Sequence, residues 1–321
     1  MDQDLLKKSI LQTLAWFDVF DYPLTGEELY RNLWGVNCIY GLDYTDFLFL
    51  IGEFLSEGLF CQEGGYYFLF GREKIIEKRE ESVLHMEKKL KIAKKGAKKI
   101  RWVPFVRAMF VCNTVAGGYT TKDSDVDVFI VVSKNRLWIT RFIVTAVFNL
   151  FWLRRKKRRV TNKICLSFYV TDNHLDLSDI KLEGDDIYLV YWLSQLVPVY
   201  DPEGVRNIIY KKNEWAKKYL LNGFGGYDLL GRYRVDDVVL SRWIKKFFEK
   251  MWVGGYGNFL NNQAMTIQKS RMKLNRKSVQ NQNNTHVVIT DEMLKFHEND
   301  RREYYRECWE KLCLAYFNGK L

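Results

Sequence analysis

The chain has 321 residues, and its 47% hydrophobic and 16% aromatic content excludes a disordered chain and can fill a sizeable core. Its length predicts two or three domains, and its 4 Pro and 21 Gly residues, which follow no period, exclude collagen-like and Pro-rich classes. The net charge of +11, from 50 Lys and Arg residues against 39 Asp and Glu, favours polyanionic partners such as nucleotides, nucleic acids or an anionic membrane.

The N-terminal part has the pattern of three short helices followed by a hairpin. Apolar side chains recur at helical spacing in residues 4–18, and Thr25 and Glu28 have the spacing of a capping box, which begins a second helix. A third helix is predicted over residues 43–57, and two apolar runs separated by a turn at Gly64 predict a hairpin. This order is typical of a winged helix.

Residues 72–100 contain no Pro and only sparse apolar positions, which predicts one long linking helix. Its second half, residues 88–99, is strongly basic, and we interpret it either as a solvated helix face or as a contact with phosphate. A second basic run, residues 154–159, is expected in a loop, where it is either solvated or binds a polyanion such as tRNA.

An apolar run at residues 108–112 ends in Asn113-Thr114, which predicts a strand, a tight turn and the start of a helix. The β-branched run that follows carries Asp125 and Asp127. Because successive side chains of a strand point to opposite faces, these two carboxylates project from the same face. Carboxylates side by side repel each other, so the pair predicts a site for Mg²⁺ or Mn²⁺.

The segment from Val111 to Val132 resembles the nucleotidyltransferase superfamily that includes DNA polymerase beta and the aminoglycoside and minimal nucleotidyltransferases. In that superfamily a strand leads into a Gly-Ser turn at a helix N-terminus, and an Asp-x-Asp strand follows. Here Asn113-Thr114 stands at the Gly-Ser position, and Ser124 opens the acidic motif. The whole chain is similar to a bacterial group with a winged-helix-like N-terminus, such a core and a helical C-terminus, and this similarity is carried by residues 13–23, 66–73, 163–166 and 296–302.

The resemblance implies a metal-dependent transfer of a nucleoside monophosphate from an NTP to a hydroxyl group by a two-metal mechanism. Asn113, Thr114 and Ser124 would bind the nucleotide, and Asp125 and Asp127 would be the catalytic metal ligands for Mg²⁺ or Mn²⁺. The NTP is then a substrate, and the acceptor is a small molecule, a protein or an RNA. Arg136, Arg141 and Lys163 flank the acidic strand and are either phosphate contacts or surface charges.

Two positions depart from the superfamily pattern. Asn113 replaces a glycine, although Asn tolerates left-handed backbone geometry better than most residues. The strand expected at residues 164–170 lacks the third carboxylate of active members, with Ser167 at about that place, and Asp172 or Asp176 would serve only if the following loop folds back. The alternative is therefore a catalytically degenerate protein that acts as a nucleic-acid-binding or regulatory module.

DNA is possible but disfavoured as a partner, because the third helix, around residues 43–53, is acidic and apolar. The most apolar stretch, residues 142–153, is shorter than the roughly 20 residues of a spanning helix, so no membrane partner is expected. The six cysteines form no zinc motif, and the N-terminus lacks a secretory-signal pattern, so we expect a cytoplasmic protein with reduced thiols.

Apolar residues at helical spacing predict packing helices over residues 185–196 and 203–220. His297, near Asp300, is expected in a terminal helix. An aromatic stripe is expected to lie in the core: Trp243, Phe247, Phe248 and Trp252.

We thus predict an α+β protein with four parts. They are a winged-helix-like module (residues 1–71), a linking helix (72–103), a small mixed-sheet nucleotidyltransferase core (104–200) and a helical region (201–321).

Overall fold

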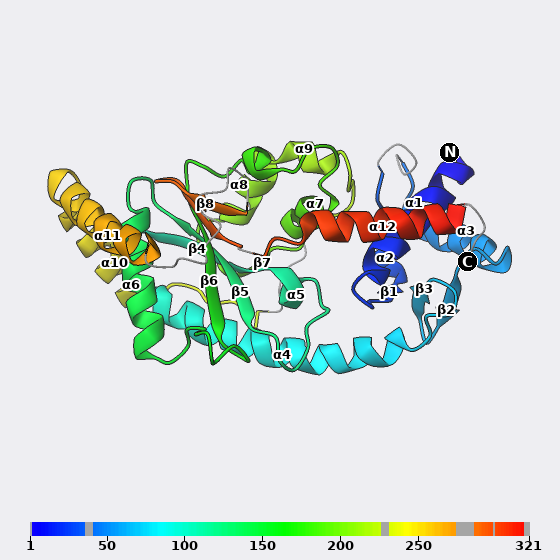
Figure 1. Ribbon diagram of the computed structural model, residues 1–321, viewed down its shortest axis with the longest axis horizontal. Helices are drawn as coiled ribbons and strands as arrows, with labels where there is room; N and C mark the ends of the chain where they lie inside the picture. Colours follow the sequence, from blue (N-terminus) through cyan, green and yellow to red (C-terminus); the bar gives the residue numbers. More distant parts are fainter. Residues whose placement is uncertain (1, 36–40, 226–230, 274–285, 298, 318–321) are drawn as a thin grey trace.

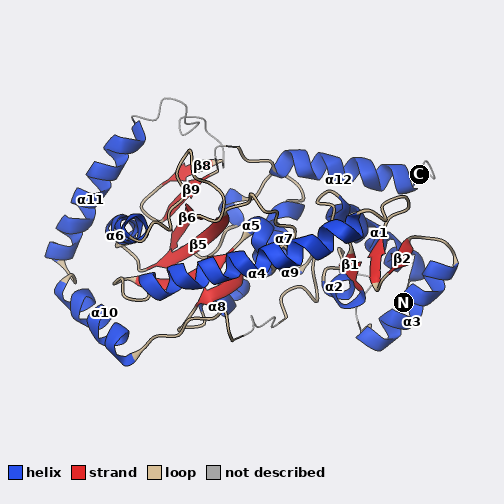
Figure 2. Cartoon of the chain, turned by 90° about the horizontal axis from the view of Figure 1, so that it is seen from below, coloured by secondary structure: helices blue, strands red, loops and turns tan. Residues whose placement is uncertain are grey.

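The computed structural model describes residues 2–35, 41–225, 231–273, 286–297 and 299–317. It is a mixed α+β structure (Figure 1), as predicted. A small helical module with its own sheet lies at one end of the molecule, a larger sheet lies in the middle, and helices α10 and α11 lie at the other end. The long helix α4 runs below the large sheet in Figure 1, and in front of it when seen from below (Figure 2), and it reaches the N-terminal module.

The N-terminal module packs three helices against a three-stranded antiparallel sheet of order β1-β3-β2. The predicted capping box is confirmed: the Thr25 side chain accepts a hydrogen bond from Glu28 N at 3.2 Å, and the Glu28 carboxylate accepts one from Thr25 N at 2.9 Å. The elements are α1 (Gln3–Asp18), β1 (Leu24–Thr25), α2 (Gly26–Arg31), α3 (Tyr44–Ser56), β2 (Cys61–Glu63) and β3 (Tyr66–Phe68).

The linking helix is confirmed as α4 (Ile75–Ile100), which has 26 residues. Its C-terminal half packs against the large sheet through apolar residues at helical spacing, among them Ala93 and Ala97. A Cβ at Gly96 would lie 2.5 Å from Cδ1 of buried Ile164, so a larger residue there would displace the end of that side chain. The lysines of the opposite face are mostly in solvent, with the exception of buried Lys89.

The large sheet has six strands in the order β7-β4-β5-β6-β9-β8. Strands β5 and β6 are parallel, joined by α6 (Leu137–Leu150), and the other neighbours are antiparallel. The strands are β4 (Val106–Val111), β5 (Val126–Val132), β6 (Ile164–Thr171), β7 (Val197–Tyr200), β8 (Val287–Ile289) and β9 (Met293–Phe296). The prediction of a wholly helical C-terminal region is therefore wrong at residues 287–296, which extend the sheet.

The side chains of β5 separate two hydrophobic cores. Val128, Ile130 and Val132 face the core that contains α4, α6 and α11. Phe129 and Val131 face the core that contains α7, α12 and the N-terminal module. The alternation of the strand assigns Asp127 to the second face.

The remaining helices are α5 (Asn113–Ala116), the short 3₁₀ helix η1 (Ser178–Ile180), α7 (Ile187–Ser194), α8 (Val205–Lys212), α9 (Glu214–Lys217), α10 (Val239–Met251), α11 (Gly255–Lys273) and α12 (Arg302–Phe317). The packing helices predicted before residue 220 are confirmed as α7, α8 and α9. His297 lies between β9 and α12, so its placement in a helix is wrong. The polar run at residues 280–284, whose composition predicts a loop, lies outside the described residues.

The aromatic stripe of α10 is not part of the core. Trp243 and Phe247 are exposed, and Phe248 and Trp252 are only partly buried. The four residues do not share one face, since at 3.6 residues per turn Trp243 and Trp252 lie on opposite sides of the helix axis. Trp252 stacks on Phe105 with the ring centroids 6.4 Å apart, whereas spacing alone does not determine whether another element covers Trp243 and Phe247.

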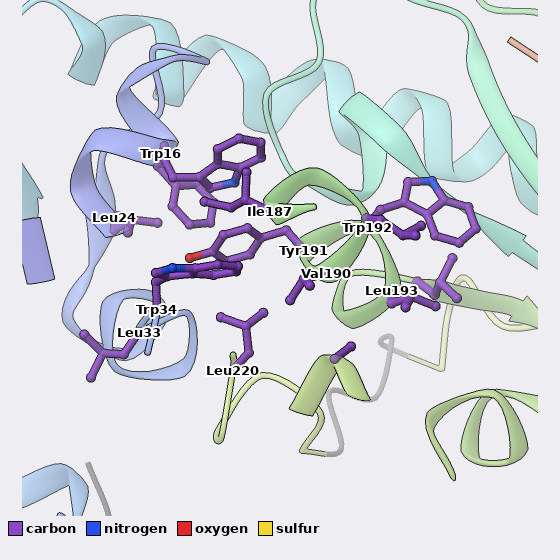
Figure 3. Packing of buried hydrophobic residues seen from close by; sticks show 14 of the residues in the cluster. Trp16, Leu24, Leu33, Trp34, Ile187, Val190, Tyr191, Trp192, Leu193 and Leu220 are labelled. Atoms are coloured by element: carbon purple, nitrogen blue, oxygen red, sulfur yellow. The ribbon is translucent and has the colours of Figure 1, made fainter. Parts of the chain in front are cut away.

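The N-terminal module is joined to the second core by stacked aromatic rings around Tyr191 of α7 (Figure 3). Its ring stacks on Trp16 with the centroids 5.4 Å apart, lies 5.8 Å from that of Trp34, and its hydroxyl donates to Asn32 O at 2.7 Å. The helix that carries these contacts also carries two side chains of the site described below.

Within the part of the chain that the structure describes, no helix is both long enough and apolar enough to cross a membrane.

Candidate functional site

Three side chains of β5 and β6 converge at one end of the large sheet. Asp125 immediately precedes β5, Asp127 lies two residues further, and Cys165 of β6 is the register partner of Asp127. One carboxylate oxygen of each acid and the Cys165 thiol all lie within 4.8 Å of one another. The two carboxylates are therefore close enough to share one cation.

Cys165 lies beside the two acids, where active members of the superfamily have a third carboxylate. Among the described residues, no third carboxylate belongs to this group. The two acids proposed from the following loop are engaged elsewhere: Asp172 accepts a hydrogen bond from Lys134 N at 2.8 Å, and Asp176 accepts one from Ser178 N at 3.0 Å. Asp127 pairs with Cys165 in the β5–β6 register, not with Ser167. The register becomes irregular between Asp127 and Phe129.

The pair is electrostatically unfavourable as it stands. Burial and the neighbouring charge of Asp125 raise the pKa of Asp127, while hydrogen bonds from Asn113 and Cys165 and the charge of Arg155 act in the opposite direction. Burial and the same two carboxylates raise the pKa of the Cys165 thiol to about 12. The thiol is therefore protonated at neutral pH and is a hydrogen-bond donor.

Arg155 comes from the second basic run and reaches the pair. Its guanidinium lies 2.8 Å from an Asp125 oxygen and 3.6 Å from the Cys165 sulfur. The sequence indicated a polyanion-binding loop but not which cation would face the acids. Burial opposes the charge of Arg155, but Asp125, Cys165 and Asp127 raise its pKa above the usual value.

Asn113 connects the turn after β4 to the pair. Its backbone has φ +56°, the left-handed geometry that the turn needs and that Asn accepts. Its side-chain oxygen accepts hydrogen bonds from Trp192 Nε1 at 3.0 Å and from the Tyr188 hydroxyl at 3.4 Å. With the oxygen fixed by these two donors of α7, the amide N–H₂ is the group that bonds Asp127.

The other two predicted nucleotide-binding residues do not line the cavity at this site. Ser124 accepts a hydrogen bond from Thr121 N at 3.0 Å, and its carbonyl accepts one from buried Lys89 at 2.6 Å. Thr114 is partly exposed and lies outside the cavity lining. Lys89 and Ser124 thus fix the turn that precedes Asp125.

A cavity of about 560 Å³ opens beside the pair, within the range of about 300–1,000 Å³ found for small-molecule sites. Asp127, Asn113 and Cys165 line it. It is also lined by residues 295–297 and 299–302, the C-terminal wall, which follow from the pairing of β9 with β6. Four aromatic residues, the aromatic wall, complete this part of the lining: Phe168, Tyr188, Trp192 and Tyr305.

A buried ionic network fixes the C-terminal wall. Asp300 lies 2.8 Å from Lys295 and 3.0 Å from Arg302, and Arg302 lies 2.7 Å from Asp186, the N-cap of α7. Burial alone would raise the pKa of Asp300, but Lys295 and Arg302 hold it well below its usual range. Burial, assisted by Arg302, lowers the pKa of Lys295 to about 8.

His297 is the neutral polar group of this wall. Burial, with a smaller contribution from Lys295, lowers its pKa to about 4, so the ring is uncharged at neutral pH. Its Nε2 atom is buried and has no hydrogen-bond partner among the described residues. A buried ring nitrogen of this kind is available to a polar ligand in the cavity.

The three cations proposed around the acidic strand have structural contacts away from the cavity. Arg136 donates to Trp252 O at 2.8 Å, Arg141 to the Gln268 side chain at 2.6 Å, and Lys163 to Trp152 O at 2.6 Å.

No protein-family model, no curated protein and no solved structure matches the chain. The interpretation of the site therefore depends on its own residues.

Replacing Asp127 by Asn should raise the thermal midpoint of unfolding at neutral pH, measured in chelator across a pH series. The raised pKa of Asp127 means that its ionised form destabilises the folded state. This penalty is absent below the ordinary pKa of an Asp, at about pH 4, and is complete above the raised pKa. The gain should therefore shrink as the pH is lowered.

Asp125→Asn is the comparison variant: it also relieves the repulsion on Asp127 but removes the ion pair with Arg155, so it should raise the midpoint less than Asp127→Asn does. A lower midpoint for Asp127→Asn at neutral pH would show that the pair is not under electrostatic strain.

Proposed function

We propose that the protein is a metal-dependent nucleotidyltransferase that moves a nucleoside monophosphate from an NTP to a hydroxyl acceptor. The observation that carries the proposal is the Asp125–Asp127 pair, held within 4.8 Å of each other beside a cavity large enough for a small molecule. Such an arrangement costs free energy unless a ligand uses it.

The connectivity supports the same proposal. Strand β4 leads through the left-handed Asn113 and the short helix α5 into the acidic strand β5, and α6 then crosses to the parallel strand β6. This resembles the strand, turn and Asp-x-Asp strand of the nucleotidyltransferase superfamily. In the N-terminal module, the element order and the sheet order β1-β3-β2 support a winged-helix-like assignment.

The donor set fits one hard divalent cation. Mg²⁺ and Mn²⁺ prefer oxygen ligands, and Mg²⁺ is typically bound by one or two carboxylates together with water and substrate phosphates. Asp125 and Asp127 would hold the ion, whereas the protonated Cys165 thiol is a poor ligand for it. When bound, the ion supplies charge that stabilises the reacting phosphate.

The other residues of the cavity have separable roles. Asn113 orients Asp127 through the hydrogen bonds that α7 fixes, and Arg155 supplies a guanidinium that suits a phosphate oxygen. The aromatic wall offers flat apolar faces of the kind on which a base stacks. The exposed Arg301 of the C-terminal wall adds positive charge for the anionic substrate.

Isothermal titration with each NTP in Mg²⁺ or Mn²⁺ tests the proposal. We expect metal-dependent binding of at least one NTP and a loss of affinity of about 100-fold or more in Asp125→Ala/Asp127→Ala, since both ligands of the ion are removed. Asp172→Ala/Asp176→Ala removes two acids that lie outside the group and should leave binding unchanged. Binding that is unaffected by loss of the pair would contradict the proposal.

The second candidate is a catalytically degenerate protein that acts as a regulatory module. It is favoured by Cys165 at the third position and by the ion pair of Arg155 with Asp125. Its contacts would be with protein rather than DNA, because α3 exposes Asp46, Phe49 and Glu53 on its outer face.

Cys165→Asp separates the two candidates. In chelator, the third carboxylate should lower the thermal midpoint of unfolding through repulsion. If the Asp125–Asp127 pair binds a cation, the same substitution should raise the affinity for Mg²⁺ or Mn²⁺ by about tenfold, and adding the ion should restore the midpoint. Cys165→Ser should show neither effect. If the Asp125–Asp127 pair binds no cation and is stabilised only by Arg155, adding the ion should not restore the thermal midpoint.

A further inference from the structure

Helix α10 buries polar side chains and exposes large apolar ones. Its inner side is polar: Ser241 and Lys245 are buried, and the Lys245 ammonium donates at 2.8 Å to both Val106 O and the Tyr200 hydroxyl. Its outer side carries large apolar residues, with Val239 76% exposed and Trp243 67% exposed. Surface helices of globular proteins normally have the opposite arrangement.

The exposed apolar side chains form one continuous ridge. We define the α10 ridge as Val239, Leu240, Trp243, Phe247 and Met251, all of them exposed and all at helical spacing. The rings of Trp243 and Phe247 stack with their centroids 6.1 Å apart. The turn into α11 continues the exposed apolar surface through Val253, Tyr256 and Phe259.

Basic residues lie along the ridge without acidic ones. Arg242, Lys246 and Lys250 are exposed on the same outer side of α10. The one acid in the two helices, Glu249, is directed inward, where it accepts a hydrogen bond from Phe105 N at 2.6 Å and lies 3.2 Å from Arg107. The outward charge of this surface is therefore entirely positive.

We propose that α10 and the start of α11 dock on an anionic lipid bilayer, with the α10 ridge at the boundary of headgroups and acyl chains and the basic residues on lipid phosphates. A helix with Trp, Phe and aliphatic residues on one side and Lys or Arg beside them binds in the plane of a membrane interface. This differs from the expectation of no membrane partner, which was based on the absence of a spanning segment.

The position of the helix favours a bilayer over a protein groove as the occupant. Helices α10 and α11 lie at the outer end of the molecule, opposite α3, in both views (Figures 1 and 2). The exposed positive charge along the ridge complements a negative lipid surface, which attracts basic residues over the range of a Debye length. This surface is separate from the Asp125–Asp127 site, so the inference does not depend on the proposed function.

Flotation of the full chain with vesicles tests the inference. We expect binding to phosphatidylcholine vesicles that contain about one third phosphatidylglycerol, and weak binding to pure phosphatidylcholine. Trp243→Ser/Phe247→Ser should lower the partition coefficient by about tenfold or more through lost apolar burial. Lys246→Gln/Lys250→Gln should lower it by a similar factor of about ten, and added salt should reduce the difference.

The controls change residues of equal exposure on other elements. Leu84→Ser on α4 and Leu314→Ser on α12 replace side chains that are 70% and 61% exposed, and Lys211→Gln/Lys212→Gln removes two exposed charges of α8. All three should bind vesicles as the unchanged protein does. No flotation with anionic vesicles, equal binding by the ridge variants, or a lipid-free dimer that Trp243→Ser/Phe247→Ser dissociates would each overturn the inference.

Discussion

The repulsion between two carboxylates on one strand is the constraint around which the site is organised. Asp125 and Asp127 lie close together because strand geometry requires it, and the burial of Asp127 makes its charge unfavourable. Three neighbours offset this cost in part: the amide of Asn113, the thiol of Cys165 and the guanidinium of Arg155. A pair that is supported in this way but not neutralised is suited to a cation that arrives with an anionic substrate.

The site combines parts of the chain that are far apart in the sequence. The Asn113 turn is held by aromatic donors of α7, and α7 is held to the N-terminal module by the rings around Tyr191. The C-terminal wall follows β9, which pairs with β6. Its network of Lys295, Asp300 and Arg302 contacts the N-cap of α7 through Asp186. The N-terminal module and the C-terminal segment therefore contact the same helix, α7.

Local signals in the sequence predicted the local features. The capping box of α2, the long helix α4, the strands β2 to β6 and the shared face of Asp125 and Asp127 follow from spacing alone. What could not be predicted depends on distant contacts. A basic run does not reveal that Arg155 faces an acid, a cysteine gives no sign that the register pairs it with Asp127, and two short strands near residue 290 form only because the edge of β6 is there to pair with. The aromatic residues of α10 were expected in the core, but Trp243 and Phe247 are exposed because no described element covers them.

The most direct measurement is the anomalous difference density of manganese in crystals grown with Mn²⁺ and a non-hydrolysable NTP. A manganese peak bridging the carboxylates of Asp125 and Asp127, with the triphosphate in the cavity beside Asn113, is the result expected if the strained pair exists to hold a cation. A cavity that takes up the nucleotide without a metal peak, while Arg155 remains on Asp125, would contradict it.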